Sequence, residues 1–391
     1  MLNVVRAGVW VAAASWLTLA VARGRFWDAR ADRLCPPQPD ADAPDVHVVV
    51  PARDEADVIG RTLRSLLRQR YAGRVAITCV DDRSSDATAA IARTVAAEDG
   101  ANERVTIVTA RPRPDGWTGK VWALAEGVAA AGEAGAQPAF WWFSDADVEH
   151  DADTLARLVA TALADERDCV SQMVALSCVT GWERLLIPAF VYFFRLLYPF
   201  AWVNDDRRAT AAAAGGCVLL AGPMLTRIGG VERIKGDLID DCALASAVKG
   251  AGGRLWLGLA TTSRSVRPYA SLDEIWSMVA RSAYTQLEYS PALLAGTVAG
   301  MALLYVVPPA ALAAGAATRR WDIAAAGLLG WGVMALTYAP TMRLYRRPRM
   351  TALGLPLAAI LYTAMTVDSA LRHARGRGGR WKGRDFSPSA P

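Results

Sequence analysis

Apolar residues in this chain follow two patterns, with short runs through its middle and long runs near its two ends. Between residue 46 and about residue 270, short apolar runs alternate with segments whose apolar residues recur at helical spacing. Such alternation predicts a mostly parallel sheet with helices on both faces. The expected strands are residues 46–50, 76–80, 105–109 and 139–143, and the expected helices are residues 56–70, 86–97 and 121–131.

The long apolar runs predict membrane segments. Residues 8–22 are followed by arginines, whereas a cleavable signal peptide carries its charge before the apolar core, so we expect an uncleaved anchor. Three more apolar runs are long enough as helices, or nearly so with their flanks, to cross a hydrocarbon layer of about 30 Å, namely residues 293–317, 323–338 and 353–367. If all three span, the basic segment after them lies outside, against the positive-inside tendency. The alternatives are that one of them is re-entrant or interfacial, or that the positive-inside rule does not hold here.

Residues 182–203 are aromatic and apolar but contain two arginines and two prolines. We interpret them as a helix or broken helix in the membrane interface, where Trp and Tyr are favoured, and the alternative is a buried core helix. The expected organisation is an N-terminal transmembrane anchor at 1–25, a linker at 26–45, an α/β domain at 46–285, C-terminal transmembrane helices at 286–371 and a basic tail at 372–391.

Composition agrees with a soluble domain joined to a membrane part. The 391 residues are 53% hydrophobic and 21% charged, and their mean hydropathy is +0.18. We therefore expect a multi-pass protein of the inner or plasma membrane with its α/β domain in the cytoplasm. The net charge is +5, and the basic residues cluster beside apolar runs without a nucleic-acid-binding motif, so we expect no nucleic acid partner. The six cysteines show no C-x-x-C pair, which excludes a disulfide framework or a zinc site of that kind.

The most informative stretch reads FWWFSDADVEH, at residues 140–150. An apolar run of strand length ends in Asp145 and Asp147, and residues two apart in an extended strand point the same way. Two hard oxygen ligands at a strand end suit Mg²⁺ or Mn²⁺ that also binds substrate phosphates. The alternative is a solvated or capping pair, because D-x-D occurs in many loops.

Two acidic motifs follow the first two expected strands. Pro51 to Glu55 lead from a strand into a helix, and ligands of open α/β sheets bind at the carboxyl ends of strands. The alternative is a pair of acids at the positive end of a helix. Asp81 and Asp82 follow the next strand and can accept hydrogen bonds from a nucleobase imide or a ribose hydroxyl, whereas Asp86 is expected to cap the following helix.

Two further motifs begin helices. The sequence GWTGK at residues 116–120 offers Lys120 as a phosphate contact beside glycines that permit close approach, unless it is an ordinary turn with a solvated lysine. Asp240 and Asp241 open a helical pattern downstream of a glycine pair at 215–216. One of these acids could act as a general base towards a hydroxyl nucleophile, and the alternative is a helix N-terminal charge.

The order of these motifs resembles that of the family 2 glycosyltransferases with the GT-A fold, over roughly residues 46–285. Residues 116–120, residues 145–147 and the WKGR sequence at 381–384 are most similar to the hopene-associated members. The resemblance implies a GT-A-like, Rossmann-like nucleotide-sugar domain with a mixed, mostly parallel sheet. It also implies a membrane-bound inverting enzyme of hopanoid-related lipid synthesis that takes a nucleotide sugar, expected to be UDP-linked, and a lipid hydroxyl, with Mg²⁺ or Mn²⁺ as cofactor.

The same resemblance assigns roles to individual residues. Asp241 matches the catalytic base, and Asp147 and Asp145 match the metal-holding motif, with Asp147 as the direct ligand. The residues that match donor- or nucleotide-binding positions are Pro51, Glu55, Asp81, Asp82, Lys120, Asp145 and Arg281.

Some features depart from well-known members of the family. The Gln-x-x-Arg-Trp motif of processive members is reduced to Arg281, and few apolar runs follow it, so polysaccharide synthesis is disfavoured. Arg83 replaces the glycine common in the Asp-Asp-Gly-Ser motif, so we expect different contacts near the base. One alternative is a nucleotidyltransferase, although residues 51–55 lack its glycine-rich loop. Another is an inactive membrane scaffold in lipid synthesis, for which the acids should be lost, yet all are present.

Overall fold

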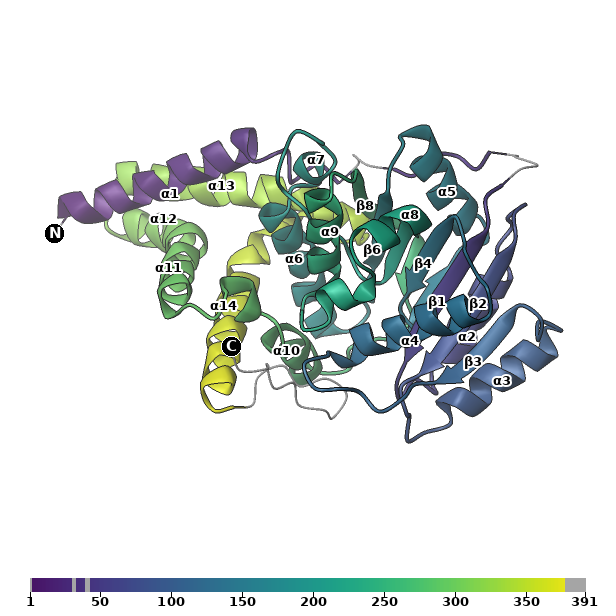
Figure 1. Cartoon of the computed structure of the whole chain (residues 1–391). Coiled ribbons are helices and arrows are strands. Elements are labelled where there is room, and N and C mark those ends of the chain that lie inside the picture. The colour runs from purple at the N-terminus through teal and green to yellow at the C-terminus, as the bar shows by residue number, and fades with distance from the viewer. Residues whose placement is uncertain (1, 30–32, 39–42, 377–391) are drawn as a thin grey trace. The chain divides into compact units, whose positions relative to one another are not determined.

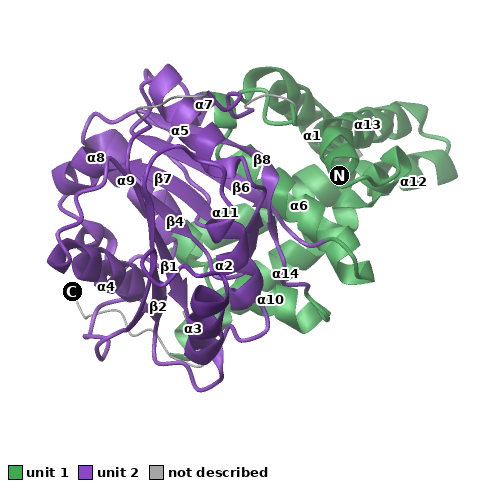
Figure 2. Ribbon diagram, turned by 90° about the vertical axis from the view of Figure 1, so that its right-hand side faces the viewer, with its two compact units in different colours: residues 1–31, 178–201, 269–379 green, residues 32–177, 202–268, 380–391 purple. Residues whose placement is uncertain are grey.

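The computed structural model describes residues 2–29, 33–38 and 43–376. The chain divides into two compact units, shown in green and purple in Figure 2. Unit 1 contains residues 1–31, 178–201 and 269–379, and unit 2 contains residues 32–177, 202–268 and 380–391. Residues 381–384, and with them most of the expected basic tail, lie outside the described residues. Each unit is considered by itself below.

Unit 2 is built around an eight-stranded sheet in the order β3-β2-β1-β4-β7-β6-β8-β5. Strand β1 is parallel to β2 and β4, β2 to β3, and β6 to β8, whereas β7 and β5 run antiparallel to their neighbours. The predicted mixed, mostly parallel sheet is therefore confirmed. The strands are β1 Val46–Ala52, β2 Val75–Asp81, β3 Val105–Thr109, β4 Phe140–Ser144, β5 Val148–His150, β6 Cys169–Ala175, β7 Cys217–Ala221 and β8 Leu255–Ser265.

The register of the parallel strands brings the polar motifs to one edge of the sheet. All residues of β1 and β4 are buried, as expected for strands covered on both faces. In the β1–β2 pair, Ala52 lies opposite Asp81, so both strands end at the same level. Strand β4 runs parallel to β1 and ends at Ser144, immediately before the two acids of the D-x-D motif.

The helices of unit 2 connect these strands (Figure 1). They are α2 Ile59–Leu67, α3 Thr88–Glu98, α4 Gly119–Glu133, α5 Thr154–Ala164, α8 Gly222–Arg227 and α9 Asp240–Gly250. Helix α4 approaches the sheet closely, because a Cβ atom at Gly127 would clash with the side chain of Val49. The four predicted strands and three predicted helices are all present. Strands β5 to β8 have no counterpart among the predicted elements.

Unit 1 is helical. Its helices are α1 Leu2–Ala22, α6 Gly181–Leu197, α10 Leu272–Ala280, α11 Pro291–Met301, α12 Val307–Ala317, α13 Trp321–Leu344 and α14 Leu355–Ala374, and α7 Phe200–Val203 begins in it. By length and composition alone, five helical segments of the described chain could cross a membrane, namely Asn3–Ala22, Gly181–Val203, Pro291–Ala317, Trp321–Leu344 and Arg349–Ala374. They include the predicted anchor and the three predicted C-terminal segments.

Helix α6 corresponds to the aromatic segment that we expected at the membrane interface. A capping box at Thr180 and Glu183 begins it, and Leu186 and Tyr192 are fully buried in the aromatic core of unit 1. At its end, Nε of Arg23 donates to the carbonyl of Leu196 at 3.1 Å, a favourable place for a cation. This burial matches the core-helix alternative, and an interfacial position stays a prediction.

Candidate active site

The two acids of the D-x-D motif lie in a turn between β4 and β5, which we call the acidic turn (residues 145–147). The N–H of Asp145 donates to the carbonyl of Gly216 at 3.3 Å, and the carbonyl of Asp147 accepts from Val266 at 2.8 Å. A bond from Val148 N–H to the carbonyl of Asp145, at 3.4 Å, closes the turn. The backbone of the acidic turn is therefore held by β7 on one side and by the end of β8 on the other.

The carboxylate of Asp147 lies in a partly buried, negatively charged setting. Burial, and next the charge of Asp145, raise the pKa of Asp147. Oγ of Ser265 donates to Oδ2 of Asp147 at 3.1 Å, and Nε of Arg267 lies 3.6 Å from the same oxygen. Two neighbouring carboxylates whose charged forms destabilise each other are a suitable pair of ligands for a divalent cation.

Lys120 connects this turn with the acids at the start of α9. It lies in the first turn of α4, and its Nζ is 2.8 Å from Oδ1 of Asp145 and 3.4 Å from Oδ2 of Asp240. Burial acts to lower the pKa of Lys120, but the charges of Asp145 and Asp240 outweigh it, so the pKa is raised. The lysine is thus a permanent cation between two acidic motifs that are distant in sequence.

Asp241 has the environment of a general base. Its Oδ2 accepts a hydrogen bond from Gly215 N–H at 2.8 Å, and its Oδ1 accepts one from Cys242 N–H at 2.8 Å. Burial first, and then the charge of Asp240, raise the pKa of Asp241 to about 6, against the opposing effects of Lys120 and the two hydrogen bonds. A carboxylate with a pKa near the working pH takes up a proton efficiently in a transition state.

Gly215 fits closely between Lys120 and Asp241. A Cβ atom at this position would lie 2.7 Å from Nζ of Lys120 and 3.4 Å from Oδ2 of Asp241. A side chain here would therefore displace at least one of the two charged groups. The preceding residue, Ala214, is fixed by Ser171, whose Oγ accepts from Ala214 N–H at 2.8 Å.

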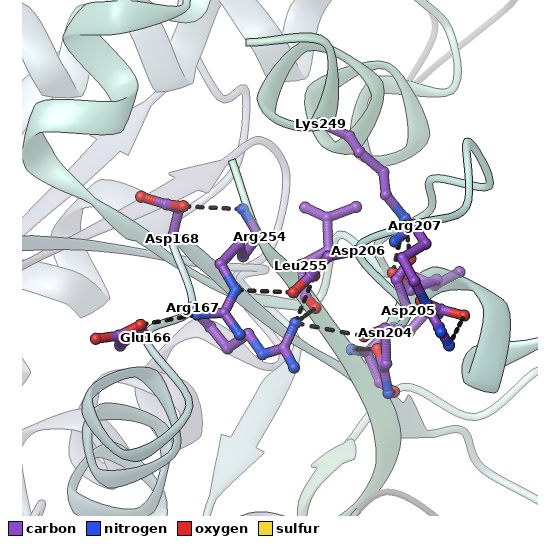
Figure 3. Close-up of polar contacts among 12 residues, drawn as sticks. Glu166, Arg167, Asp168, Asn204, Asp205, Asp206, Arg207, Lys249, Arg254 and Leu255 are labelled. Atoms are coloured by element: carbon purple, nitrogen blue, oxygen red, sulfur yellow. Dashed lines mark hydrogen bonds and ion pairs between the residues drawn. The ribbon is translucent and has the colours of Figure 1, made fainter. Parts of the chain in front are cut away.

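The segment that leads to Gly215 is tied down at its beginning by a polar network, shown in Figure 3. Asp206 accepts from Arg167 and from Arg254, each at 2.8 Å. Asn204 is bonded to both backbone groups of Leu257. Lys249, near the end of α9, donates to the carbonyls of Val203, Asp205 and Thr210. Helix α9 thus holds the segment at one end and presents Asp240 and Asp241 at the other.

The polar motifs that follow β1 and β2 contact each other. Nη1 of Arg53 donates to the backbone carbonyl of Arg83 at 3.2 Å and also contacts the carbonyl of Asp82. Asp81 and Asp82 are buried, and Oδ1 of Asp81 accepts from Ser84 N–H at 3.2 Å. Their assigned contact with the nucleoside stays a prediction.

The expected helix cap at Asp86 is wrong in its position. The N-cap of α3 is Ala87, which makes no side-chain cap bond. Asp86 instead accepts from Thr88 N–H at 2.9 Å with one oxygen and from Ala56 N–H at 3.0 Å with the other. These hydrogen bonds outweigh the effect of burial and lower the pKa of Asp86. Its role is structural, as expected, but it links the start of α3 to the loop after β1.

Several predicted site residues are connected by contacts with residues that the sequence analysis did not identify. Arg267, two residues after β8, forms an ion pair with Glu55 and approaches Asp147, so it connects the β1 motif to the acidic turn. Ser265 and Arg267 were missed because β8 was not among the predicted strands. Had β8 been recognised, the rule that ligands bind at strand ends would have pointed to them.

Pro51 and Arg281 complete the set of predicted site residues. Pro51 lies within β1, one residue before its end. Arg281 follows α10 as its C-cap residue and belongs to unit 1, so its assigned contact with the donor stays a prediction.

Comparisons with known proteins agree with the fold. The model of the family described as "Glycosyltransferase like family 2" matches residues 44–285. No curated protein matches the chain. A mannosyltransferase from Pyrobaculum calidifontis, solved in complex with GDP-Man and Mn²⁺, is 20% identical, with 95% of this chain and 99% of that chain covered and a TM-score of 0.56. Glucosyl-3-phosphoglycerate synthase from Mycobacterium tuberculosis, in complex with Mn²⁺, UDP and glucosyl-3-phosphoglycerate, is 17% identical, with 63% of this chain and 81% of that chain covered and a TM-score of 0.42.

Proposed function

This chain belongs to the glycosyltransferase-like family 2 and is a glycosyltransferase with a GT-A fold, and from that premise we propose its reaction and its substrates. The protein is a membrane-bound inverting enzyme that moves a sugar from a nucleotide-sugar donor to a hydroxyl of a membrane lipid. The observation that carries the proposal is the position of Lys120, whose Nζ lies 2.8 Å from Asp145 and 3.4 Å from Asp240. A candidate phosphate and metal site and a candidate base are thereby joined in one charged cluster.

The acidic turn fits a divalent cation of the Mg²⁺ or Mn²⁺ type. Such ions are typically held by one or two carboxylates, with substrate phosphates and water as the other ligands. Asp145 and Asp147 offer two carboxylates at one strand end, and among the described residues there is no group of three or more His, Cys, Asp or Glu side chains suited to a metal. When bound there, the cation would offset negative charge on the leaving nucleoside diphosphate.

The residues of the chain supply the remaining chemistry. Asp241 takes the proton of the acceptor hydroxyl. The hydroxyl oxygen attacks the anomeric carbon of the donor sugar from the face opposite the diphosphate. A single displacement of this kind inverts the anomeric configuration. Lys120 stabilises the negative charge that develops on the leaving group. The hydrogen bonds from Gly215 and Cys242 hold the carboxylate of Asp241 in one orientation.

The acceptor is proposed from the composition of unit 1 and from the family resemblance. Five helical segments of the described chain are long and apolar enough to cross a membrane, which favours an acceptor that resides in the bilayer. The resemblance to hopene-associated members makes a hopanoid-related lipid the first acceptor to test. The arginines after α1 support a multi-pass protein of the inner or plasma membrane with unit 2 in the cytoplasm, where nucleotide sugars are available.

The test is to incubate the purified full-length protein with a panel of nucleotide sugars and a native lipid extract, and to search for a glycolipid by mass spectrometry. The panel contains UDP-linked sugars, as the resemblance implies, and GDP-mannose, because the Pyrobaculum mannosyltransferase of similar fold was solved with it. Asp241→Asn is the matched control, since it should bind donor without transferring it. Donor hydrolysis without any glycolipid would refute the lipid acceptor, and transfer of the nucleotide itself would favour a nucleotidyltransferase.

A further inference from the structure

His150 is a buried histidine that the proposed reaction does not use. It is the last residue of β5, and its side chain is 4% exposed. Its two ring nitrogens each lie 2.9 Å from a serine hydroxyl, Nε2 from Ser144 and Nδ1 from Ser263. Because Ser144 ends β4 and Ser263 belongs to β8, the ring connects two strands across the acidic turn.

Both serines have a second polar neighbour. Oγ of Ser263 lies 3.2 Å from Oε1 of Gln172, and Oγ of Ser144 lies 3.3 Å from the carbonyl oxygen of Asp145. In either tautomer of the neutral ring, one nitrogen donates to a serine hydroxyl and the other accepts from one, so the ring bridges the two hydroxyls. Burial lowers the pKa of His150 to about 3, so the neutral ring keeps this arrangement at physiological pH.

Both ends of this hydrogen-bonded chain lead to an acid of the acidic turn. Ser144 directly precedes Asp145 in the sequence. Ser263 lies two residues before Ser265, whose hydroxyl donates to Asp147 at 3.1 Å. Trp142 packs edge-on against the imidazole, with ring centroids 4.7 Å apart, and so restricts its rotation.

We propose that His150 is a positioning residue that holds the acidic turn, and with it the carboxylates of Asp145 and Asp147, in place for a divalent cation. This inference rests on the proposed function, because it takes the acidic turn as the cation site. Residues that orient metal ligands through hydrogen bonds typically change metal affinity by about 10–100-fold when they are removed. His150→Ala is therefore expected to weaken Mn²⁺ binding by about that factor.

His47 offers a matched control within the same unit. It is 7% exposed, its Nε2 lies 2.8 Å from Oγ1 of Thr78, and its ring lies 5.3 Å from that of Trp141. Burial, and then the charge of Arg74, lower its pKa to about 4, so it is also a neutral histidine beside a tryptophan. It is the second residue of β1, at the edge of the sheet opposite the acidic turn. His47→Ala should lower stability to a similar degree and leave Mn²⁺ affinity unchanged.

The experiment uses the full-length protein in detergent. Mn²⁺ is titrated in the presence of UDP or GDP and followed by electron paramagnetic resonance, and thermal unfolding is measured on the same samples. The variants are His150→Ala, His47→Ala, Ser144→Ala and Asp147→Ala. Ser144→Ala removes the hydrogen bond between Ser144 and His150 with a smaller loss of side-chain volume. It therefore tests the proposal if His150→Ala does not fold. Ser144 and His150 share one hydrogen bond. A folded variant that carries both Ser144→Ala and His150→Ala should therefore lose no more affinity for Mn²⁺ than either single variant.

The inference is supported if His150→Ala or Ser144→Ala weakens Mn²⁺ binding about tenfold or more while His47→Ala does not. It is overturned if the first two variants bind Mn²⁺ like the wild type, or if His47→Ala loses as much affinity as they do. Asp147→Ala separates this failure from that of the proposed function. If Asp147→Ala binds Mn²⁺ as the wild type does, or if the wild type binds no Mn²⁺, the acidic turn is not the cation site. Both proposals then fail together.

Discussion

The Nζ atom of Lys120 lies 2.8 Å from Oδ1 of Asp145, so the start of α4 and the end of β4 are joined by an ion pair. The same nitrogen lies 3.4 Å from Oδ2 of Asp240 at the start of α9. One positive charge therefore already lies among the acids where a divalent cation is proposed. Binding of the cation and of the donor phosphates must then change the partners of this lysine.

Lys120→Met should change the affinity for the metal and the affinity for the donor nucleotide in opposite directions. Without the ammonium group, Asp145 and Asp240 lose a cation that competes with the metal, so the affinity for Mn²⁺ alone should rise. The affinity for a nucleoside diphosphate should fall by about tenfold or more, since a hydrogen bond to a charged group contributes about 1.5–3 kcal/mol. Calorimetric titration with Mn²⁺ alone and then with UDP or GDP measures both quantities. A fall in both affinities would show that Lys120 supports the fold of the site and does not compete with the cation.

Asp147→Ala should abolish transfer with little effect on folding. Asp147 lies in a turn and not in the sheet core, and its side chain is bonded to Ser265 and Arg267 at the edge of the site. Its raised pKa shows that its charge is destabilising in the folded protein without a cation, so its removal should not lower the melting temperature. Transfer assays at saturating Mg²⁺ or Mn²⁺, with thermal unfolding as a check of folding, test this. A folded variant with wild-type turnover would refute the role of Asp147.

The sequence predicted the first half of unit 2 well because its signals are local. Strands β1 to β4 are short runs rich in β-branched and aromatic residues, of which β1 and β4 are buried throughout, and polar motifs with glycine, proline or acids follow them. Strand β5 has only three residues, and β6 and β8 mix apolar residues with Ser, Gln, Thr or Arg. Their positions depend on pairing with distant strands, such as β8 with β5 and β6, which no local pattern encodes.

The site shows the same division. Asp145, Asp147, Lys120 and Asp241 follow or begin recognisable elements, so their residue types and positions pointed to chemistry. Arg267 acquires meaning only because β8 ends next to the acidic turn. The roles of Gly215 and Ser265 likewise depend on side chains far away in the sequence, and only the folded chain shows them.

The dependence of transfer on pH should reveal Asp241. Burial and the charge of Asp240 raise its pKa to about 6. The base is active only when deprotonated, so kcat/KM should fall as the pH is lowered through about 6, by tenfold per unit at the acid limit. Lys120→Met should move this fall in kcat/KM to higher pH, because the positive charge of Lys120 acts against the raised pKa of Asp241. A profile that stays flat down to pH 5 would exclude Asp241 as the titrating base.

The same raised pKa predicts a gain in stability when the charge is removed. Because the folded pKa of Asp241 exceeds its unfolded value, its contribution to stability is complete at low pH and is lost as the pH rises through about 6. Asp241→Asn should therefore have a higher melting temperature than the wild type at pH 8, with a smaller difference at pH 5. A variant that is less stable at both values would show that the hydrogen bonds from Gly215 and Cys242 outweigh the burial of the charge.

The proposed topology places unit 2 in the cytoplasm. Asp99 follows α3 at the surface of unit 2 and is suited to a cysteine probe. A thiol reagent that cannot cross membranes should not label Asp99→Cys in intact cells and should label it after permeabilisation. The unsubstituted protein controls for its own cysteines, of which Cys79, Cys169, Cys217 and Cys242 are buried. Ready labelling in intact cells would reverse the orientation and separate the site from cytoplasmic nucleotide sugars.

Asp240 and Asp241 should differ in what they contribute, although they are adjacent. Asp241→Asn keeps the size of the side chain but cannot take up a proton, so transfer to lipid should fall by about 10²–10⁴-fold. Nucleotide affinity should survive, because the proposed phosphate and metal contacts lie on Lys120 and the acidic turn. Asp240→Asn should have a milder effect, since Asp240 pairs with the ammonium group of Lys120, at 3.4 Å, and is not the acid proposed to take the proton.

The two variants are compared by lipid transfer rate and by nucleotide affinity in parallel. Asp241 is favoured as the base because its two oxygens accept hydrogen bonds from Gly215 and Cys242, and because its pKa is raised to about 6. Normal transfer by Asp241→Asn together with an inactive Asp240→Asn would move the base by one residue along α9. If both variants transfer normally, the start of α9 does not activate the acceptor, and the base must be sought elsewhere.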